Sequence, residues 1–490
     1  MEAFKKPRSF DRNLVVIGAG SGGLVSAYLA AAMGAKVTLI EKGEMGGDCL
    51  NRGCVPSKAL IRSGRIVSEL RKAKALGFLE ATAKIDFNAV MERVQQVVET
   101  IAPNDSVERY TELGVEVLQG EGTITSPWSV SVNGQSLTTR TIIIATGARP
   151  RIPAIDGIEQ IDYLTSDTIW KLRTLPQRLL VLGTGTIGCE LAQVFSQLGS
   201  RVSLLGRNTL LPREDEALSA LMGRQFEQEE GIELLLHKES VSFVREGDEQ
   251  ILRYRDRLNP SAAVAELAFD QVLVATGRIA NTEGLGLERV GIRTHEGGAI
   301  ASNDYLQTHC PSIYVCGDVA GSYQFTHAAS NQAWSAAVNA LFGFLKQFQV
   351  NEQVMPRVTF TTPEIARVGL NEREAERQGV AYEVTQFPFS ELDRAITESE
   401  LLGWIKVLTL PGKDKILGVT IVGEHAGDLL QEYVLAMRHG LGLNKILATI
   451  HPYPTFVEIN QRVAGKWKRE HAPKGLLKWV RRFHRWRRAG

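Results

Sequence analysis

The hydrophobic pattern of the first forty residues alternates between short apolar runs and an alanine-rich stretch. Four consecutive apolar positions at 14–17 predict a buried strand, the alanine-rich segment after them predicts a helix, and residues 37–41 predict a second strand. Strand, helix and strand in succession are typical of α/β proteins with a parallel sheet. We therefore expect an α/β fold.

The turn between the first strand and the helix has the pattern GxGxxG, formed by Gly18, Gly20 and Gly23. Glycines at these positions allow a tight turn and a close approach of the backbone to a pyrophosphate at the helix N-terminus. Glu41 ends the second strand, where a carboxylate can accept a hydrogen bond from an adenosine ribose. The segment predicts a dinucleotide site.

The same pattern recurs about 165 residues later, between apolar runs at 179–182 and 202–205. Its glycines are Gly183, Gly185 and Gly188. The repeat predicts a second dinucleotide-binding fold that follows the first along the chain.

The two repeats differ where the second strand ends. The position that matches Glu41 is Gly206, followed by Arg207 and later by Arg213. Without a carboxylate at this position, nothing there repels the 2′-phosphate of NADPH, and guanidinium groups can pair with that phosphate. We expect NADPH rather than NADH at this fold, with NADH possible; the alternative is that both arginines are solvated surface residues.

Three further apolar strands end in small-residue turns, at Gly147, at Gly277 and at Asp318. From about residue 351 the pattern changes to the mixture of strands and helices expected of an α+β domain. The predicted domains are 1–155 and 282–350, which together form the first nucleotide domain, 156–281 for the second, 351–465 for a C-terminal domain, and a tail at 466–490.

Composition narrows the class of protein. The chain has 490 residues, 44% hydrophobic and 23% charged, which excludes a disordered or fibrous protein. Five cysteines, no apolar run long enough to span a membrane and no leader-like start favour a cytoplasmic enzyme. The net charge of +1 combines a tail of +9 with a body near −8, so no specific nucleic-acid partner is expected.

Two of the cysteines, Cys49 and Cys54, lie in the segment GGDCLNRGCVPSK at 46–58. Five positions apart at an expected helix start, they can close a small redox ring, and the helix dipole favours a thiolate there. Structural zinc is the alternative, but no histidine or further cysteine nearby completes a tetrahedral set. We expect a redox disulfide and no metal site.

Taken together, these motifs resemble the class I pyridine nucleotide-disulfide oxidoreductases over about residues 12–465, with PRVTFTTPE at 356–364 as a further match. The resemblance implies two Rossmann-like domains, a C-terminal dimerisation domain and a homodimer. It also implies FAD on the first fold, with Asp318 near its ribityl chain and Lys58 beside the flavin, paired with Glu190. Electrons would pass from nicotinamide through flavin to the disulfide, leaving Cys54 against the flavin and Cys49 free to attack an acceptor.

The chain departs from this family near its C-terminus. Disulfide reductases of the family have His-Pro-Thr-x-x-Glu there, whereas this chain has Tyr453 at the histidine position and keeps Glu458. A phenol, with a pKa of about 10, is a poor proton shuttle at neutral pH. His451 is an alternative base, although a structural role beside a proline is the simpler interpretation.

The acceptor therefore stays open among three interpretations. Tyrosine at this point resembles mercuric reductase, and a soft metal ion held by thiolates needs no proton for a leaving sulfur. That family uses a C-terminal cysteine pair, which this chain lacks, because no cysteine follows Cys316. A low-molecular-weight disulfide such as lipoamide, or a protein acceptor of an electron-relay flavoprotein, are the alternatives.

The tail at 473–490 places apolar residues on one helical stripe among cations. Such a helix can lie on an anionic membrane surface, at the inner face for a cytoplasmic protein, or pack on the acidic body of its own dimer.

Overall fold

The computed structural model describes residues 4–321 and 323–489, which divide into two compact units. The first unit contains the chain up to Leu211 together with Gly223–Asn351, and the second contains Pro212–Met222 with the chain from Glu352 onward. The short segment Pro212–Met222 thus belongs with the C-terminal unit, although it lies inside the range expected for the second nucleotide domain.

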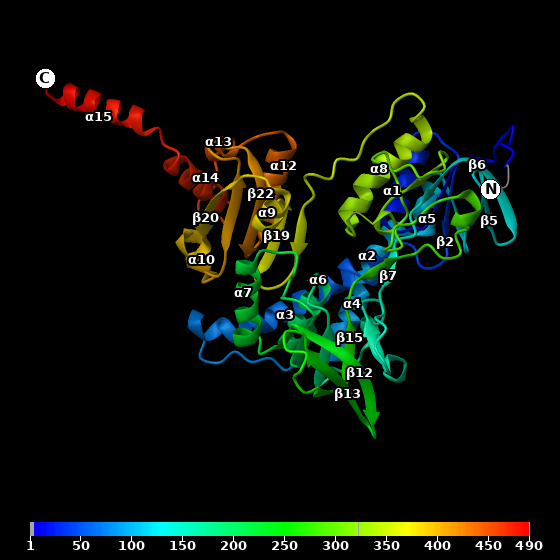
Figure 1. Cartoon of the computed structure of the whole chain (residues 1–490), viewed down its shortest axis with the longest axis horizontal. Helices are drawn as coiled ribbons and strands as arrows, with labels where there is room; N and C mark the ends of the chain where they lie inside the picture. Colours follow the sequence, from blue (N-terminus) through cyan, green and yellow to red (C-terminus); the bar gives the residue numbers. More distant parts are fainter. Residues whose placement is uncertain (1–3, 322, 490) are drawn as a thin grey trace. The chain divides into compact units, whose positions relative to one another are not determined.

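The first sheet has the strand order β3-β2-β1-β6-β5-β4, with β17 also paired to β6. Its strands are β1 (Arg12–Ile17), β2 (Val37–Glu41), β3 (Val115–Gln119), β4 (Thr123–Ser126), β5 (Ser129–Val132), β6 (Gln135–Ile144) and β17 (Ile313–Val315). β1 is parallel to β2 and β6, and its apolar run is buried, as expected of a parallel strand covered on both faces. Helices α1 (Ser21–Ala32) and α8 (Thr326–Phe342) pack against each other beside this sheet (Figure 1).

The second sheet is parallel throughout, in the order β11-β10-β9-β15-β8. Its strands are β8 (Tyr163–Thr165), β9 (Arg178–Leu182), β10 (Arg201–Gly206), β11 (Glu233–Leu236) and β15 (Gln271–Val274), and α6 (Thr186–Leu198) follows β9. An antiparallel sheet of β12 (Lys238–Glu246), β13 (Glu249–Asp256) and β14 (Ala265–Phe269) shares its core, where the rings of Phe243 and Phe269 meet edge to face.

Two features join the nucleotide domains inside the first unit. Strands β7 (Ala148–Pro150) and β16 (Arg278–Ala280) follow the two Ala-Thr-Gly turns and pair antiparallel. Helix α3 (Cys54–Lys72) packs on α6 so closely that a Cβ on Gly64 would lie 2.7 Å from a methyl carbon of Val194. The remaining α-helices of this unit are α2 (Gly47–Asn51), α4 (Phe87–Ile101) and α5 (Val107–Glu112).

The second unit has an antiparallel sheet in the order β18-β19-β22-β21-β20. Its strands are β18 (Arg357–Thr359), β19 (Glu364–Gly369), β20 (Glu383–Pro388), β21 (Trp404–Thr409) and β22 (Ile416–Gly423). Its helices are α9 (Glu372–Gln378), α10 (Asp393–Glu398), α11 (Ala426–Leu429), α12 (Gln431–Arg438), α13 (Leu443–Ala448) and α14 (Glu458–Glu470), with most of α7 (Glu216–Arg224). The expected α/β chain with a C-terminal α+β domain is confirmed.

The segment Pro212–Met222 is held in the second unit by buried ion pairs. Arg367, which is almost fully buried, lies 3.0 Å from Glu214 of this segment and 2.6 Å from Glu374 at the start of α9. A buried guanidinium needs such partners, because an unpaired charge costs several kcal/mol inside a protein. These contacts explain why the segment belongs with residues more than a hundred positions away.

The last helix of the described chain is α15 (Lys474–Arg488), coloured red in Figure 1, and none of its residues is buried. Within residues 4–321 and 323–489, no helix is long and apolar enough to cross a bilayer.

Candidate redox site and nucleotide sites

The glycines of the first turn have different tasks. Gly18 has a φ of +102°, and a Cβ there would lie 2.4 Å from the carbonyl oxygen of Ala145; a Cβ on Gly23 would lie 1.7 Å from that of Gly18. These two positions require glycine for packing. A Cβ on Gly20 would have 3.8 Å to its nearest neighbour, so this turn keeps the open space over α1 into which a pyrophosphate fits.

Glu41 lies at the end of β2, beside this turn. Its Oε2 accepts a hydrogen bond from the backbone N–H of Ala19 at 2.6 Å, and its Oε1 accepts one from Gly43 at 2.7 Å. Each carboxylate oxygen keeps a further lone pair, so Glu41 can also accept from a ribose hydroxyl. The residues of the first fold therefore fit FAD.

The second turn repeats this division. Gly183, at a φ of +115°, would bring a Cβ within 2.3 Å of the Ala275 carbonyl, and a Cβ on Gly188 would lie 1.9 Å from that of Gly183. A Cβ on Gly185 would meet nothing within 4 Å. The space over α6 is open at Gly185 alone of the three, which fits a nucleotide pyrophosphate.

The end of β10 leaves little room for a side chain at Gly206, the position that matches Glu41. A Cβ on Gly206 would lie 2.4 Å from the Cγ2 methyl of Thr184, so a larger residue would displace that side chain. Next to it, the exposed guanidinium of Arg207 bonds Glu239 of β12 at 2.9 Å. Glu239 is shared with Arg255 of β13, at 3.0 Å. One carboxylate thus holds two arginines.

A third cation joins this cluster, because the Arg257 guanidinium donates to the carbonyl of Arg207. The sequence did not single out Arg255 or Arg257, which reach Arg207 through the β12–β13 pairing. Arg213 is exposed and lies in the second unit, where its carbonyl accepts from the Asn371 side chain at 3.1 Å.

The two cysteines lie on consecutive helices. Cys49 is in α2 and Cys54 is the first residue of α3; both are free thiols in the structure. The Thr326 hydroxyl, at the start of α8, lies 3.5 Å from the Cys54 sulfur. A hydrogen bond from Cys49, aided by Thr326 and the charge of Lys58, lowers the pKa of Cys54, whereas the pKa of Cys49 is raised because it keeps that proton.

Lys58, one turn into α3 from Cys54, makes the ion pair that the resemblance implied. Its Nζ lies 2.7 Å from Oε2 of Glu190 on α6, and the Glu190 side chain is only 6% exposed. Nζ also donates to Ser57 at 3.3 Å, and the Ser57 hydroxyl donates to the Cys54 carbonyl at 3.2 Å. The pair fixes the ammonium group beside the thiolate and across the α3–α6 contact.

Arg278 connects three of the sequence motifs and was missed by sequence reasoning. Its guanidinium forms an ion pair with Asp48, next to Cys49, and donates to the Ala148 carbonyl at 2.6 Å. Its buried Nε lies 3.6 Å from Asp318 and has no hydrogen-bond partner among the described residues. Its place directly after Gly277 was the one available signal, and only the fold brings it to Asp48, Ala148 and Asp318.

Asp318 follows the turn after β17, where the N–H of Gly317 donates to the Gln332 side chain at 2.8 Å. Burial raises the pKa of Asp318 to about 6, although Arg278 opposes this shift. Gly147 and Gly277 end the other two turns, at φ of +68° and +118°, directly before β7 and β16. The described contacts of Asp318 are therefore the nearby Arg278 guanidinium and the buried turn on which it lies.

The other cysteines, Cys189, Cys310 and Cys316, are buried and unsuited to redox exchange. Burial raises the pKa of Cys189 and raises that of Cys316 to about 12, so neither forms a thiolate near neutral pH. In the described part of the chain, no group of three or more histidine, cysteine or acidic side chains could hold a metal ion.

The C-terminal segment with Tyr453 and Glu458 lies in the second unit. The Tyr453 side chain is exposed, and a hydrogen bond to Asp393 raises the pKa of its phenol. Glu458 instead pairs with Arg462 at 3.5 Å and accepts from the N–H of Thr455 at 3.4 Å. The phenol is therefore a still weaker acid than a free tyrosine, and its hydrogen-bond partner is not Glu458.

His451, the alternative base, is engaged at both ring nitrogens. Nδ1 lies 3.0 Å from the Thr449 carbonyl and Nε2 lies 3.1 Å from Glu432, and the side chain is 4% exposed. Asn460 also donates to Glu432, at 2.9 Å. This arrangement supports the structural interpretation of His451.

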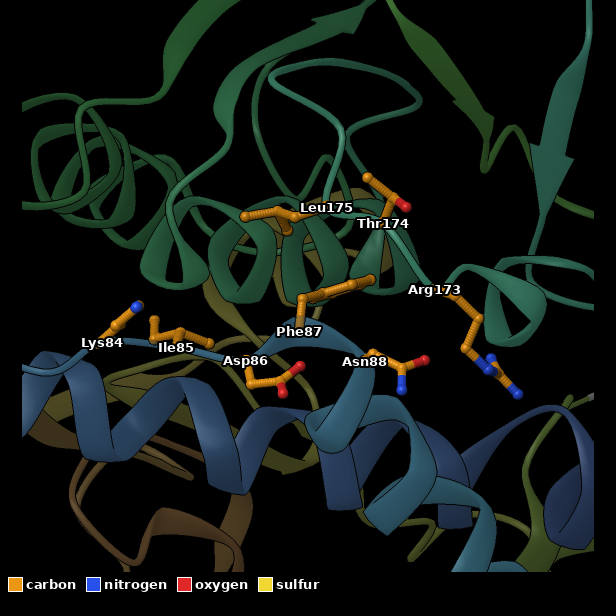
Figure 2. A pocket seen from close by; sticks show the side chains of 8 residues that line it. All are labelled: Lys84, Ile85, Asp86, Phe87, Asn88, Arg173, Thr174 and Leu175. Atoms are coloured by element: carbon orange, nitrogen blue, oxygen red, sulfur yellow. The ribbon is translucent and has the colours of Figure 1, made fainter.

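Figure 2 shows an open pocket between the start of α4 and the loop 173–175. Its polar groups are used locally: Asp86 caps α4 by accepting from Ala89, and Arg173 donates to the carbonyls of Trp170 and Leu172. No predicted site residue lines it.

Two dinucleotide-type turns around a thiol pair with an adjacent lysine define a dithiol oxidoreductase. Family models agree: residues 12–333 match the pyridine nucleotide-disulphide oxidoreductase family and residues 355–464 match its dimerisation domain. The chain belongs to this family, whose members use FAD and a pyridine nucleotide.

Relatives of two activities are equally similar. A mercuric reductase of Lysinibacillus sphaericus is 36% identical over 91% of this chain and 81% of its own length. A dihydrolipoyl dehydrogenase of Chlamydia muridarum is 36% identical over 91% and 94%. The HOCl-induced flavoprotein disulfide reductase RclA of Escherichia coli superposes with a TM-score of 0.81 at 25% identity, over 92% and 99% of the two chains.

Proposed function

We propose that this protein uses NADPH to reduce a thiophilic metal ion, with mercuric ion the leading candidate, through Cys49 and Cys54. The observation that carries the proposal is the state of the family's acid/base position. The position has Tyr453 in place of a histidine, and a hydrogen bond to Asp393 raises the pKa of its phenol. Both ring nitrogens of the nearby His451 contact other groups, the Thr449 carbonyl and Glu432. A disulfide acceptor needs a proton for its leaving sulfur, whereas a soft ion bound by two thiolates does not.

Bound on the first fold, FAD would supply the chemistry that links hydride transfer from the nicotinamide to two-electron transfer at the cysteine pair. The chain holds the Cys54 thiolate beside Lys58, and the ion would displace the proton of Cys49 when both sulfurs bind it. Overall, NADPH loses a hydride, Hg(II) gains two electrons, and one proton is released. Similarity to mercuric reductases and the solved Cu(II) complex of RclA support a metal acceptor.

NADPH preference is part of this proposal. It is supported by the absence of a carboxylate at Gly206 and by the cluster of Arg207, Arg255 and Arg257 beside it. Guanidinium groups match the geometry of a phosphate monoester, so the adenosine 2′-phosphate of NADPH is their natural ligand. Arg213 is a further candidate from the sequence.

A homodimer is also proposed. The dimerisation domain supports it, as do large apolar side chains of the second unit that are open to solvent, such as Ile450 at 93% exposure and Leu435 at 59%. Light scattering at two protein concentrations measures this directly.

The test is NADPH oxidation by the FAD-loaded protein with Hg(II) in excess small thiol, oxidised lipoamide or glutathione disulfide. We expect turnover with Hg(II) alone. Cys49→Ser should abolish it while flavin reduction by NADPH persists, and Cys310→Ser, which removes a buried thiol elsewhere, should leave it intact. Turnover with a disulfide would favour the second candidate, which similarity to dihydrolipoyl dehydrogenases supports. No NADPH oxidation with any of the three acceptors would point to a protein or quinone acceptor.

A further inference from the structure

The proposed chemistry makes no use of the C-terminal helix α15. None of its residues is buried, and its two tryptophans are among the most exposed aromatic side chains of the described chain, with Trp479 at 62% and Trp486 at 72%. An exposed tryptophan leaves a large apolar area in water, and burying this area against a partner is favourable. A helix with two exposed tryptophans is therefore expected to bind an apolar surface.

The side chains of α15 are sorted onto two faces. At about 100° per residue, the apolar side chains fall on one arc and most cations on the opposite arc. The apolar arc contains Leu476, Trp479, Val480, Phe483 and Trp486, and the opposite arc contains Lys474, Lys478, Arg481, Arg482, Arg485 and Arg488. The apolar arc is an aromatic ridge: the ring centroids of Trp479 and Phe483 are 5.8 Å apart, and those of Phe483 and Trp486 are 6.1 Å apart.

The charge of α15 selects its partner. Its sequence, KGLLKWVRRFHRWRR, has seven Lys and Arg residues and no acidic residue. Nucleic acid would satisfy these cations and leave the ridge in water, whereas a purely apolar protein groove would satisfy the ridge alone. An anionic bilayer surface satisfies both, because phosphate headgroups lie directly above the acyl boundary.

We propose that α15 lies in the plane of an anionic membrane surface, with its aromatic ridge at the acyl boundary and its cations among the headgroups. The helix does not span the bilayer. It follows α14 after a short connection at 471–473, and α14 is fixed in the second unit by the buried Trp467. The membrane contact would therefore tether the enzyme through its second unit.

The experiment is co-sedimentation of the full-length, FAD-loaded protein with vesicles of phosphatidylcholine alone or phosphatidylcholine with phosphatidylglycerol. Binding should require phosphatidylglycerol and weaken at high salt, because headgroup attraction is screened. Equal binding to both vesicles, or no binding to the anionic ones at low salt, would overturn the proposal.

Charge variants measure the electrostatic part. Arg482→Gln with Arg485→Gln should weaken binding to anionic vesicles roughly thirtyfold, at about one charge's worth of headgroup attraction each. The matched control is Lys413→Gln with Lys415→Gln, two exposed cations in the turn between β21 and β22, which should bind as the parent protein does. Equal losses in both variants would mean that net charge alone drives binding, against the proposal.

Tryptophan variants measure insertion. Trp479→Ala and Trp486→Ala should each weaken binding about tenfold. The control is Trp334→Ala, which removes a half-exposed tryptophan from α8. Undiminished binding of the Trp479 and Trp486 variants would mean an electrostatic contact without insertion and would refute the assignment.

Protection of tryptophan fluorescence from a soluble quencher tests the competing arrangement, in which α15 packs on the protein's own dimer. In the parent protein without vesicles, acrylamide should quench Trp479 and Trp486 as fully exposed residues, and anionic vesicles should then shield them. Shielding without vesicles would place α15 against the protein's own dimer and overturn the proposal. NADPH oxidation with a soluble acceptor should be the same in all variants, which shows that they are folded.

Discussion

Nucleotide preference offers a prediction with two changes of opposite sign. Glu239 holds Arg207 at 2.9 Å and Arg255 at 3.0 Å, so a 2′-phosphate must compete with this carboxylate for the same guanidinium groups. Glu239→Gln should therefore tighten NADPH, and Arg207→Gln should weaken it. NADH, which has no 2′-phosphate, should keep its affinity in both variants.

The magnitude for Glu239→Gln follows from Coulomb's law. A phosphate bound on the free side of Arg207 lies about 6 Å from the carboxylate, and at a water-like dielectric constant this repulsion is about 1 kcal/mol. Salt near 0.1 M reduces it by roughly half, because the Debye length is about 10 Å. The repulsion that remains is about 0.5 kcal/mol, which corresponds to a gain of about twofold in NADPH affinity, and this gain should shrink further at high salt.

The magnitude for Arg207→Gln is larger. A hydrogen bond between charged groups contributes about 1.5–3 kcal/mol, and the exposure of Arg207 favours the lower end. The expected loss is about tenfold in NADPH affinity. The same substitution also removes the exposed ion pair with Glu239, which should change the free energy of unfolding by less than this.

The assay is the ratio of kcat/KM for NADPH and NADH, together with binding of each nucleotide to the oxidised protein. The matched control is Glu266→Gln, which removes one carboxylate from the same small sheet, where it pairs with Arg253 at 2.8 Å. It should leave the ratio unchanged. Parallel shifts for NADPH and NADH in the Glu239 and Arg207 variants would refute a phosphate site at this cluster.

Three further predictions concern the redox pair and the turns. The pKa of Cys54 is lowered and that of Cys49 is raised. Alkylation of the reduced protein at varied pH should therefore show one thiolate that persists below the ordinary range of thiol pKa values and a second that appears only above it. Two thiols that titrate together near a pH of about 8.5 would contradict this. Lys58→Met should raise the pKa of the Cys54 thiol, seen as a shift of the thiolate absorbance to higher pH, and an unshifted titration would show that Lys58 does not act on Cys54. Gly188→Ala should lower the free energy of unfolding by about 1–3 kcal/mol, because its Cβ meets the Gly183 carbonyl, whereas Gly185→Ala should preserve stability and weaken NADPH; chemical denaturation and nucleotide titration would expose any reversal of this order.

The amino-acid sequence by itself determined the architecture and the local parts of the candidate site. A strand that runs into GxGxxG has few ways to fold, because Gly18 and Gly183 need a positive φ and Gly23 and Gly188 permit close backbone contact. The helix start expected at this pair is found at Cys54, the first residue of α3, whereas Cys49 lies inside the short helix α2. The amphipathic tail was likewise readable, since helical periodicity depends only on neighbouring residues.

Only the tertiary structure decided which distant side chains act together. Thr326 reaches Cys54 across 272 positions of sequence, and Arg278 reaches Asp48 across 230. Glu239 meets Arg207 because β12 follows the second nucleotide sheet, and Asp393 is the hydrogen-bond partner of Tyr453. These pairings depend on how strands and helices assemble, so no local pattern encodes them, and they set the thiol pKa values, the competition for NADPH and the weak acid at Tyr453.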